Sequence, residues 1–555
     1  MLFAILLGIW QLNSQELEMV DSMLNKGANT GINGDGKNHS DLAEESETVE
    51  ITEALNSFSL EEELPPSATE RLASHDENEF KKKEFLAKDK KGQTAWHKAA
   101  AEGKLESLEI IWRWAKEVEL TADELLLASS EEGESALHLA AQGNHLGILE
   151  KLWGWAEEEQ ISGNELKKKL FLAKDKHGQT AWHKAAAEGK LESLETIWRW
   201  AKEVELTPDE LLLDQDEDGL TALYLAVQGN QVGILETLWV WVEKAQKNPN
   251  DLKKKIFLTT DKLGYTAWHH AAYFGRIEAL DTLWSWAKEV EVRPDDLLLT
   301  RSEEGETVLH LAIPENRVEV LQKLWGWAEE EQINGNELKK KLFLAKDKNG
   351  QTAWHKAAVE WDLESLETIW RWAKEVELTA DELLLDQDKD GRTALYFIVK
   401  GNQVGKLETL WVWVEEAQVN ANELKKKLLL TKNKHGFTAW HHAATDGSLK
   451  VLETLWNWAK EEEINRDELL LAQIEEGLTA MHLAACMNRV RILKKLWFWT
   501  EEAGVNASEL KKKLLLAKDN KGYTALERAT QFGSLEALET LKSWEKEGEL
   551  KRDEL

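Results

Sequence analysis

Apolar residues recur at helical spacing along most of the chain. In a representative segment, Thr-Ala opens a stretch whose apolar positions lie three and four residues apart, at Trp182, Ala185 and Ala186, as on one helix face. A second stretch, from Leu191 to about Glu203, places its apolar residues on one stripe. A third, shorter stretch reads DELLL or NELKKKLFL. The pattern predicts three helices in each segment.

A glycine turn opens every segment. A Gly-x-Thr-Ala-like pattern occurs eleven times, and the intervals between its glycines alternate between 41 and 45 residues. The glycines are Gly92, Gly133, Gly178, Gly219, Gly264, Gly305, Gly350, Gly391, Gly436, Gly477 and Gly522. A fixed period of this length is typical of a stacked array. We therefore predict an all-α solenoid, built of two-repeat modules of 86 residues, and we name each repeat after its glycine.

These repeats resemble ankyrin repeats. The strings GQTAWHKAA (92–100), GESALHLAA (133–141), GLTALYLAV (219–227) and GLTAMHLAA (477–485) are similar to the family's turn glycine, Thr-Pro-Leu-His and Ala-Ala. The resemblance covers roughly residues 80–555. It implies an ankyrin-like array of helices with short hairpin turns.

Three departures from the ankyrin pattern predict a thicker array. Alanine replaces the proline of Thr-Pro, so the first helix relies on the helix propensity of alanine. The glycine that ends the second helix in the family is missing, and Trp114-Ala115-Lys116 lies in its region, so we expect that helix to continue for about a turn or more. The period of 41 or 45 residues exceeds the usual ~33, which indicates an extra helix per repeat.

Tryptophan is concentrated on the second helix. Twenty of the 28 tryptophans form Trp-x-Trp pairs such as Trp112 and Trp114, and positions two apart on a helix point about 200° apart. We expect one ring to face the core of its own repeat and the other to pack under the extra helix. The alternative is an exposed aromatic ladder that stacks bases or sugars, but such a row of rings would promote aggregation.

One histidine recurs at a fixed position in eight repeats. These residues are His97, His138, His183, His269, His310, His355, His441 and His482. Tyr224 and Tyr396 replace it in two others. One histidine per repeat makes a poor metal site, and the neighbours in His269–His270 diverge on a helix. In the ankyrin pattern this histidine braces the start of the first helix, and the resemblance implies the same role here.

Two turns imitate the opening of a calcium loop. DQDEDG (214–219) and DQDKDG (386–391) carry the early carboxylates. The loop also requires a bidentate glutamate at position twelve, where the chain has Leu225 and Phe397. We interpret both as solvated turns, with weak Ca²⁺ binding as the alternative.

The chain is strongly acidic, with 102 acidic and 69 basic residues and a formal net charge of −33. This balance argues against binding to DNA or RNA, which requires a clustered basic surface. Lysine triads recur every 86 residues, at 81–83, 167–169, 253–255, 339–341, 425–427 and 511–513. We interpret them as solvated helix faces balanced by acidic runs, with a basic ribbon for a polyanion as the alternative.

Enzyme chemistry has little support in the sequence. No Ser/His/Asp, Cys/His, phosphate-loop or Cys-x-x-Cys pattern stands out, and Cys486 is the only cysteine. We predict a protein that is not an enzyme and that has no metal or cofactor. No run of about 18 apolar residues follows the N-terminus, so we expect no membrane span.

Ankyrin arrays usually bind proteins through their turn tips and first helices. Three tips in this chain carry aromatic residues, Tyr265, Phe437 and Tyr523. On the first helix, Tyr273, Phe274 and Phe532 replace smaller or polar residues of other repeats. Aromatic residues amid polar neighbours are candidate binding hot spots. The alternative is that they fill space between repeats.

The terminal segments differ from the array. Residues 1–10 read MLFAILLGIW, which is either a signal peptide or an apolar helix turn. Residues 11–78 form an acidic lead-in that we predict to be disordered. We assign 79–521 to the array, with ten full repeats from Gly92. We assign 522–555 to a capping repeat, because polar residues replace apolar ones there.

The last four residues, Arg-Asp-Glu-Leu, are similar to an ER-retrieval signal. The same string occurs inside INRDELLL (464–471), so the terminal copy is equally a truncated repeat. Asn38 and Asn506 lie in Asn-x-Ser sites that a secreted chain would expose to glycosylation.

The sequence as a whole favours a monomeric, cytoplasmic, non-enzymatic scaffold that binds other proteins. The alternative is a secreted or ER-resident repeat protein, toxin-like or effector-like. No sequence feature identifies the partner protein.

Overall fold

The computed structural model describes residues 86–550, apart from 159–162, 245–248, 315–316, 331–334, 417–420, 463 and 503–506. The chain divides into Met1–Asn78 and Glu79–Leu555, and all of the described residues belong to the second part. The predicted segments 1–10 and 11–78 lie outside the described residues, as do residues 552–555 and both Asn-x-Ser asparagines, Asn38 and Asn506.

The described part of the chain is all-helical, with 32 helices and no strand among its residues. This confirms the predicted all-α class. The first helices of successive repeats are α5 (Ala95–Ala101), α8 (Ala136–Gly143), α11 (Ala181–Ala187), α14 (Ala222–Gln228), α17 (Ala267–Tyr273), α20 (Val308–Ala312), α23 (Ala353–Val359), α26 (Ala394–Lys400), α29 (Ala439–Asp446), α32 (Ala480–Cys486) and α35 (Ala525–Gln531).

The second helices carry the Trp-x-Trp pairs. They are α6 (Leu105–Glu117), α9 (Leu146–Glu158), α12 (Leu191–Glu203), α15 (Val232–Glu243), α18 (Ile277–Glu289), α21 (Val318–Glu330), α24 (Glu364–Glu375), α27 (Val404–Glu416), α30 (Leu449–Glu461), α33 (Val490–Glu501) and α36 (Leu535–Leu550). In the last of these, a single tryptophan remains, Trp544.

The third helices are of two lengths. The short ones are α7 (Ala122–Leu126), α13 (Pro208–Leu212), α19 (Pro294–Leu298), α25 (Ala380–Leu384) and α31 (Arg466–Leu471). The long ones are α10 (Gly163–Phe171), α16 (Pro249–Leu258), α22 (Gly335–Leu344), α28 (Ala421–Leu430) and α34 (Ala507–Leu516). We call the 41-residue and 45-residue repeats short and long repeats accordingly.

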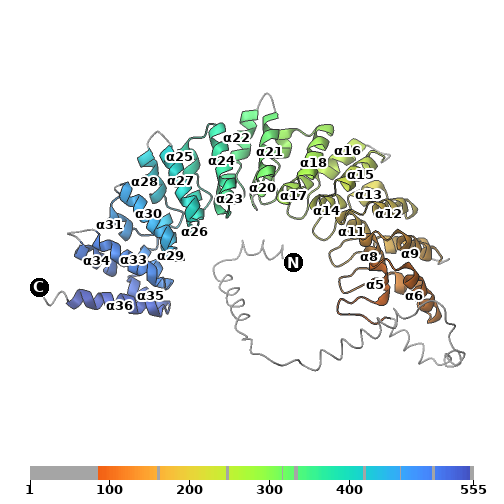
Figure 1. Cartoon of the computed structure of the whole chain (residues 1–555), viewed down its shortest axis with the longest axis horizontal. Helices are drawn as coiled ribbons and strands as arrows, with labels where there is room; N and C mark the ends of the chain where they lie inside the picture. The colour runs from red at the N-terminus through yellow and green to blue at the C-terminus, as the bar shows by residue number, and fades with distance from the viewer. Residues whose placement is uncertain are drawn as a thin grey trace, which may run out of the picture. The chain divides into compact units, whose positions relative to one another are not determined.

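Neighbouring repeats pack in chain order. Each first helix contacts the first helix of the next repeat, from α5 against α8 to α32 against α35. Figure 1 shows the first helices along one side of this part of the chain and the second and third helices along the other. The buried apolar side chains form one cluster that runs from Trp96 to Trp544. Each repeat therefore buries its apolar faces against its neighbours.

The second helices end in an unexpected way. In four short repeats a glutamate takes the left-handed conformation just past the helix, at Glu119, Glu205, Glu291 and Glu377, with φ between 57° and 60°. After Glu205, the backbone N–H of Leu206 donates to the carbonyl of Ala201 at 2.9 Å, which closes the helix as glycine usually does. In these repeats a glutamate with a strained backbone therefore follows the end of the second helix, where no glycine is present.

Tryptophan rings stack across the boundaries between repeats. The first ring of each Trp-x-Trp pair stacks on the second ring of the next repeat, with centroids 3.9 to 4.8 Å apart. Our expectation of one ring in the repeat's own core and one under the extra helix is therefore incomplete, because each pair reaches both neighbouring repeats. Trp114 stacks on no other ring of the described residues, and it is 46% exposed.

Candidate functional site

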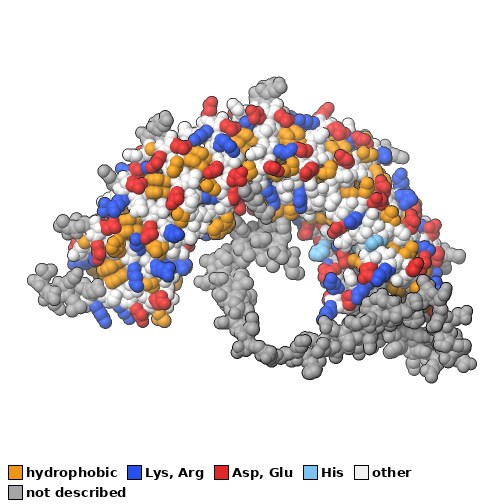
Figure 2. Space-filling view, viewed as in Figure 1, with side chains coloured by type: hydrophobic (Ala, Val, Ile, Leu, Met, Phe, Trp, Pro, Cys, Tyr) orange, Lys and Arg blue, Asp and Glu red, His pale blue; other side chains and the backbone are white. Residues whose placement is uncertain are grey.

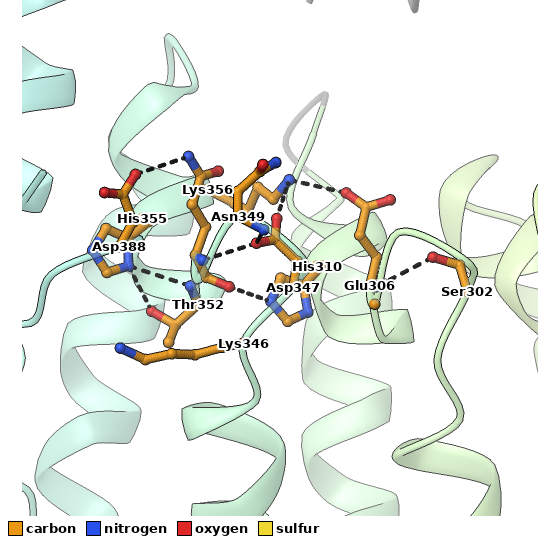
Figure 3. Close-up of polar contacts among 12 residues, drawn as sticks. Ser302, Glu306, His310, Lys346, Asp347, Asn349, Thr352, His355, Lys356 and Asp388 are labelled. Carbon is orange, nitrogen blue, oxygen red and sulfur yellow. Dashed lines mark hydrogen bonds and ion pairs between the residues drawn. The ribbon is translucent and has the colours of Figure 1, made fainter. Parts of the chain in front are cut away.

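A polar network joins the turns of neighbouring repeats. Figure 3 shows one example, in which the imidazole of His310 lies toward the Gly350 turn and Lys356 lies between two carboxylates. Lys356 Nζ is 2.9 Å from Glu306 and 3.1 Å from Asp347. Burial alone would lower the pKa of Lys356, but these carboxylates raise it above its usual value. The lysine therefore stays charged and joins two successive turns.

The recurring histidines use both ring nitrogens inside this network. In the Gly178 repeat, the hydroxyl of Thr180 lies 2.9 Å from Nδ1 of His183, and Nε2 lies 3.1 Å from the carbonyl oxygen of Asp214 in the next repeat. Because a carbonyl only accepts, Nε2 carries the proton. Burial lowers the pKa of all eight histidines, and that of His441 falls to about 4. These imidazoles are neutral braces between repeats.

The turn carboxylates accept hydrogen bonds from the backbone. Oδ1 of Asp216, in the calcium-like string, accepts from the N–H groups of Asp218 and Leu220 at 3.0 and 2.8 Å, and Asp216 is buried. This is the geometry of a closed turn, although the carboxylate is buried and not solvated as the sequence suggested. The described residues contain no group of three or more His, Cys, Asp or Glu side chains arranged to hold a metal ion.

The lysine triads are only partly solvated. The first lysine is buried in four of the described triads, at Lys167, Lys253, Lys339 and Lys425. Lys167 Nζ lies 5.1 Å from the ring centroid of Trp153 and is 3.0 Å from Glu157 and 3.1 Å from Glu203. The interpretation as a solvated face is wrong for these four lysines, although a residue of the acidic run, Glu157, does pair with Lys167. In these four triads at most two lysines can reach a partner. Residues 81–83 lie outside the described residues.

Three of the six candidate binding residues gather in the Gly264 repeat. Tyr265 lies at the turn and donates a 2.6 Å hydrogen bond to Glu306, while burial is the main cause of its raised pKa. Tyr273 and Phe274 meet edge to face with centroids 5.1 Å apart, and the Arg317 guanidinium lies 5.3 Å from the Tyr273 centroid. All three aromatic residues are half-buried, so part of each surface packs within the array and part faces solvent.

The other three candidates lie apart from this group. Phe437 is half-buried, with its ring centroid 4.8 Å from that of His442. Tyr523 is also half-buried and lies under Arg528 at 5.1 Å. Phe532 is 61% exposed and follows α35, where the exposed Leu535 begins the next helix. Among the six, Phe532 presents the most open ring.

Sequence reasoning missed the most exposed large apolar side chain in the described residues. Trp361 is 83% exposed, just beyond α23. Its signal was visible, because every other repeat has Gly or Asn at this position.

Two small cavities lie between packed segments of neighbouring repeats. Leu212, Trp239 and Ile256 line one of them, and Tyr396, Leu428 and Phe437 line the other. Each has a volume of about 10 Å³, which is room for about one water molecule.

No family model matches the chain, and no curated protein matches it either. None of the helices in the described part combines the length and the apolar character that crossing a bilayer requires.

Proposed function

We propose that this chain is a non-enzymatic protein-interaction scaffold, built of ankyrin-like repeats that stack into a solenoid. One observation carries the proposal. Polar side chains that recur at fixed positions in several repeats, such as His183 and Lys356, contact the neighbouring repeat, while side chains that depart from the pattern, such as Trp361 and Phe532, face solvent. A surface that varies over a repeated support suits recognition of another macromolecule.

The partner we propose is a protein. The net charge of −33 disfavours nucleic acid. Figure 2 shows acidic and basic side chains interspersed with apolar patches over the visible face, a mixture suited to polar rims around aromatic contacts. The half-buried Tyr273 and Phe274 and the exposed Phe532 are the proposed contacts.

Affinity capture with the full-length chain tests this function. We expect bound proteins to be recovered at least ~10-fold less well by a Tyr273→Ser/Phe532→Ser variant, because loss of two aromatic contacts costs more than about 1.4 kcal/mol. Phe498→Ser is the matched control, since Phe498 is 51% exposed on the second helix α33 and should leave recovery unchanged. Equal recovery by all three chains would contradict the proposed binding residues, and no captured protein at all would contradict the scaffold function.

We propose the cytoplasm as the compartment. Expression of the intact chain in a eukaryotic cell should give a product without N-terminal cleavage and without glycan at Asn38 or Asn506. Cleavage together with glycosylation would instead support the secreted or ER-resident alternative.

A further inference from the structure

The turn that carries Trp361 departs from all of its counterparts. The described residues at this position in the other repeats have left-handed backbones, with φ from 53° at Asn402 to 80° at Gly447. Bulky side chains rarely adopt that conformation. In the Gly350 repeat, α23 ends at Val359, and Glu360 is extended with φ −62° and ψ 158°. The chain thus leaves the usual path and presents Trp361 to solvent.

A lysine from the next repeat supports this altered turn. In the Gly178 repeat, Gly189 occupies the position of Trp361. The backbone N–H of the next residue, Lys190, donates to the carbonyl of Ala185 at 2.9 Å. In the Gly350 repeat the matching carbonyl, that of Ala357, accepts a 2.8 Å hydrogen bond from Lys406 Nζ. Lys406 also donates to the carbonyl of Glu360. A side chain therefore takes over the role of the usual backbone bond.

Lys406 stands where the equivalent long repeat has Ile234, 172 residues earlier. The lysine is only 3% exposed. Burial lowers its pKa to about 8, although Asp362 and Glu360 act in the opposite direction. A buried ammonium is a costly replacement for isoleucine, so the pair Trp361 and Lys406 forms one specialised feature in an otherwise repetitive chain.

Carboxylates flank the exposed indole. Glu360, Asp362 and Glu364 lie within three residues of Trp361. Asp362 also accepts a 3.0 Å hydrogen bond from the N–H of Ser365 at the start of α24, which holds it beside the turn. An indole face attracts cations through its quadrupole, and nearby carboxylates add to that attraction. The chemistry of this turn is complementary to a positive charge.

We propose that the Trp361 turn, residues 360–364 supported by Lys406, is a docking site for a cationic segment of a partner protein. An arginine or lysine of that segment lies over the indole, and the flanking carboxylates pair with its neighbouring cations. The proposal rests on the proposed scaffold function and assigns the chemistry of one partner.

The test uses the full-length chain labelled with 5-fluorotryptophan. The Trp361 ¹⁹F signal is identified by its absence from the Trp361→Gly variant, which restores the glycine of the Gly178 repeat. A second variant, Trp361→Gly/Asp362→Lys/Lys406→Ile, restores the residues of the equivalent repeats, Gly189, Lys190 and Ile234. It should fold even if the single substitution leaves Lys406 without its support. The probes are three labelled eight-residue peptides, in which serine alternates with arginine, with glutamate or with leucine.

We expect the arginine peptide to shift the Trp361 signal and to bind wild type about fivefold more tightly than either variant, as one exposed cation–π contact predicts. Phe498→Ser should bind like wild type, and Glu360→Gln/Asp362→Asn should bind more weakly. Equal affinity for wild type and Trp361→Gly would overturn the proposal. So would a Trp361 shift of equal size with the glutamate or leucine peptide, or a dimer in sedimentation that Trp361→Gly abolishes. If the affinity-capture test with the Tyr273→Ser/Phe532→Ser variant succeeds, these outcomes contradict the Trp361 docking site alone and leave the scaffold function intact. Failure of that capture test would contradict both proposals.

Discussion

Two kinds of contact alternate between repeats, and they use tryptophan differently. From a short to a long repeat, three rings pack together, as in Trp96, Trp112 and Trp155, with centroids 4.6 to 6.2 Å apart. From a long to a short repeat, two tryptophan rings stack, Trp153 and Trp200, at 4.4 Å. We call these the three-ring contact and the two-ring contact, and each occurs five times in the described residues.

Charged groups complete the two-ring contact. The indole N–H of Trp239 donates to Glu289 at 2.9 Å, and Lys253 Nζ lies 4.9 Å from the Trp239 centroid while it pairs with Glu243 and Glu289. The hydrogen bond from Lys253 is the main cause of the lowered pKa of Glu289. The long third helix supplies this lysine. The comparison teaches that one Trp-x-Trp motif can serve an apolar or a polar boundary, depending on what the neighbouring helix places over the ring.

Acid should weaken both contacts and have the largest effect. The folded chain keeps histidines such as His269 and His310 neutral, with pKa values of about 4, against 6.5 for a solvent-exposed histidine. Stability is therefore complete above pH 6.5 and is lost as the pH falls toward 4, by up to about 1.4 kcal/mol per pH unit for each histidine. Urea unfolding at pH 7.5, 6, 5 and 4.5 measures this slope.

A matched variant sharpens the acid prediction. His310→Tyr places in the Gly305 repeat the residue that the Gly219 repeat has at this position, Tyr224. The slope should fall by the contribution of one histidine. An unchanged slope would show that these buried imidazoles do not control acid stability.

Loss of a ring from the three-ring contact should come next. Trp268 is 1% exposed and contacts Trp284 and Trp327, so Trp268→Ala should lower the free energy of unfolding by about 3–5 kcal/mol. The control is Trp114→Ala, at a ring that is 46% exposed, where we expect a loss of less than about 1 kcal/mol. Thermal and urea unfolding followed by circular dichroism compare the two variants, and equal losses would refute the distinction between buried and exposed rings.

The two-ring contact should be weakened by removal of its lysine. Lys253→Ala leaves Glu243 and Glu289 without their shared cation, and we expect a loss of about 1–2 kcal/mol, since both carboxylates remain partly solvated. Lys254→Ala, at the exposed second lysine of the same triad, should change stability by less than about 0.5 kcal/mol. Urea midpoints decide between them. Similar midpoints for both variants would mean that the charged groups add no stability to this boundary between repeats.

The smallest effect should be a gain in stability at the left-handed glutamates of the short repeats. Glu205 is exposed and has a φ of 60°, so Glu205→Gly should relieve backbone strain and stabilise the chain by about 0.5–1 kcal/mol. The same substitution inside α12, Glu195→Gly, should destabilise by about 1 kcal/mol. A loss of stability at both positions would contradict the strain seen at the end of the helix.

Sequence periodicity predicted the order and approximate ends of the helices, because each boundary carries a local signal. Thr180 caps the first helix and Thr207 caps the third. Contacts between repeats were harder to predict. Period and spacing show that Trp153 and Trp200 lie on helices, but not that their rings stack across a boundary. The burial of Lys167 was missed for the same reason, since the Glu203 that neutralises it lies 36 residues away.

The candidate binding residues show a similar limit. An aromatic residue at a turn is easy to find in the sequence, but the fraction of its ring that faces solvent depends on neighbouring repeats. Tyr265 therefore proved half-buried and Phe532 open. Trp361 was detectable as an exception to Gly or Asn, whereas its support by Lys406 needed the structure.

The alternation of three-ring and two-ring contacts also restricts how this chain can change in length. Deletion of one 41-residue or 45-residue repeat would bring two repeats of the same kind together, and their contact faces do not match. Two short repeats in contact, for example, would lack the long third helix that places Lys253 over Trp239. Removal or duplication of a whole 86-residue module leaves every contact with its proper counterpart. Gene variants of this chain should therefore gain or lose repeats in even numbers.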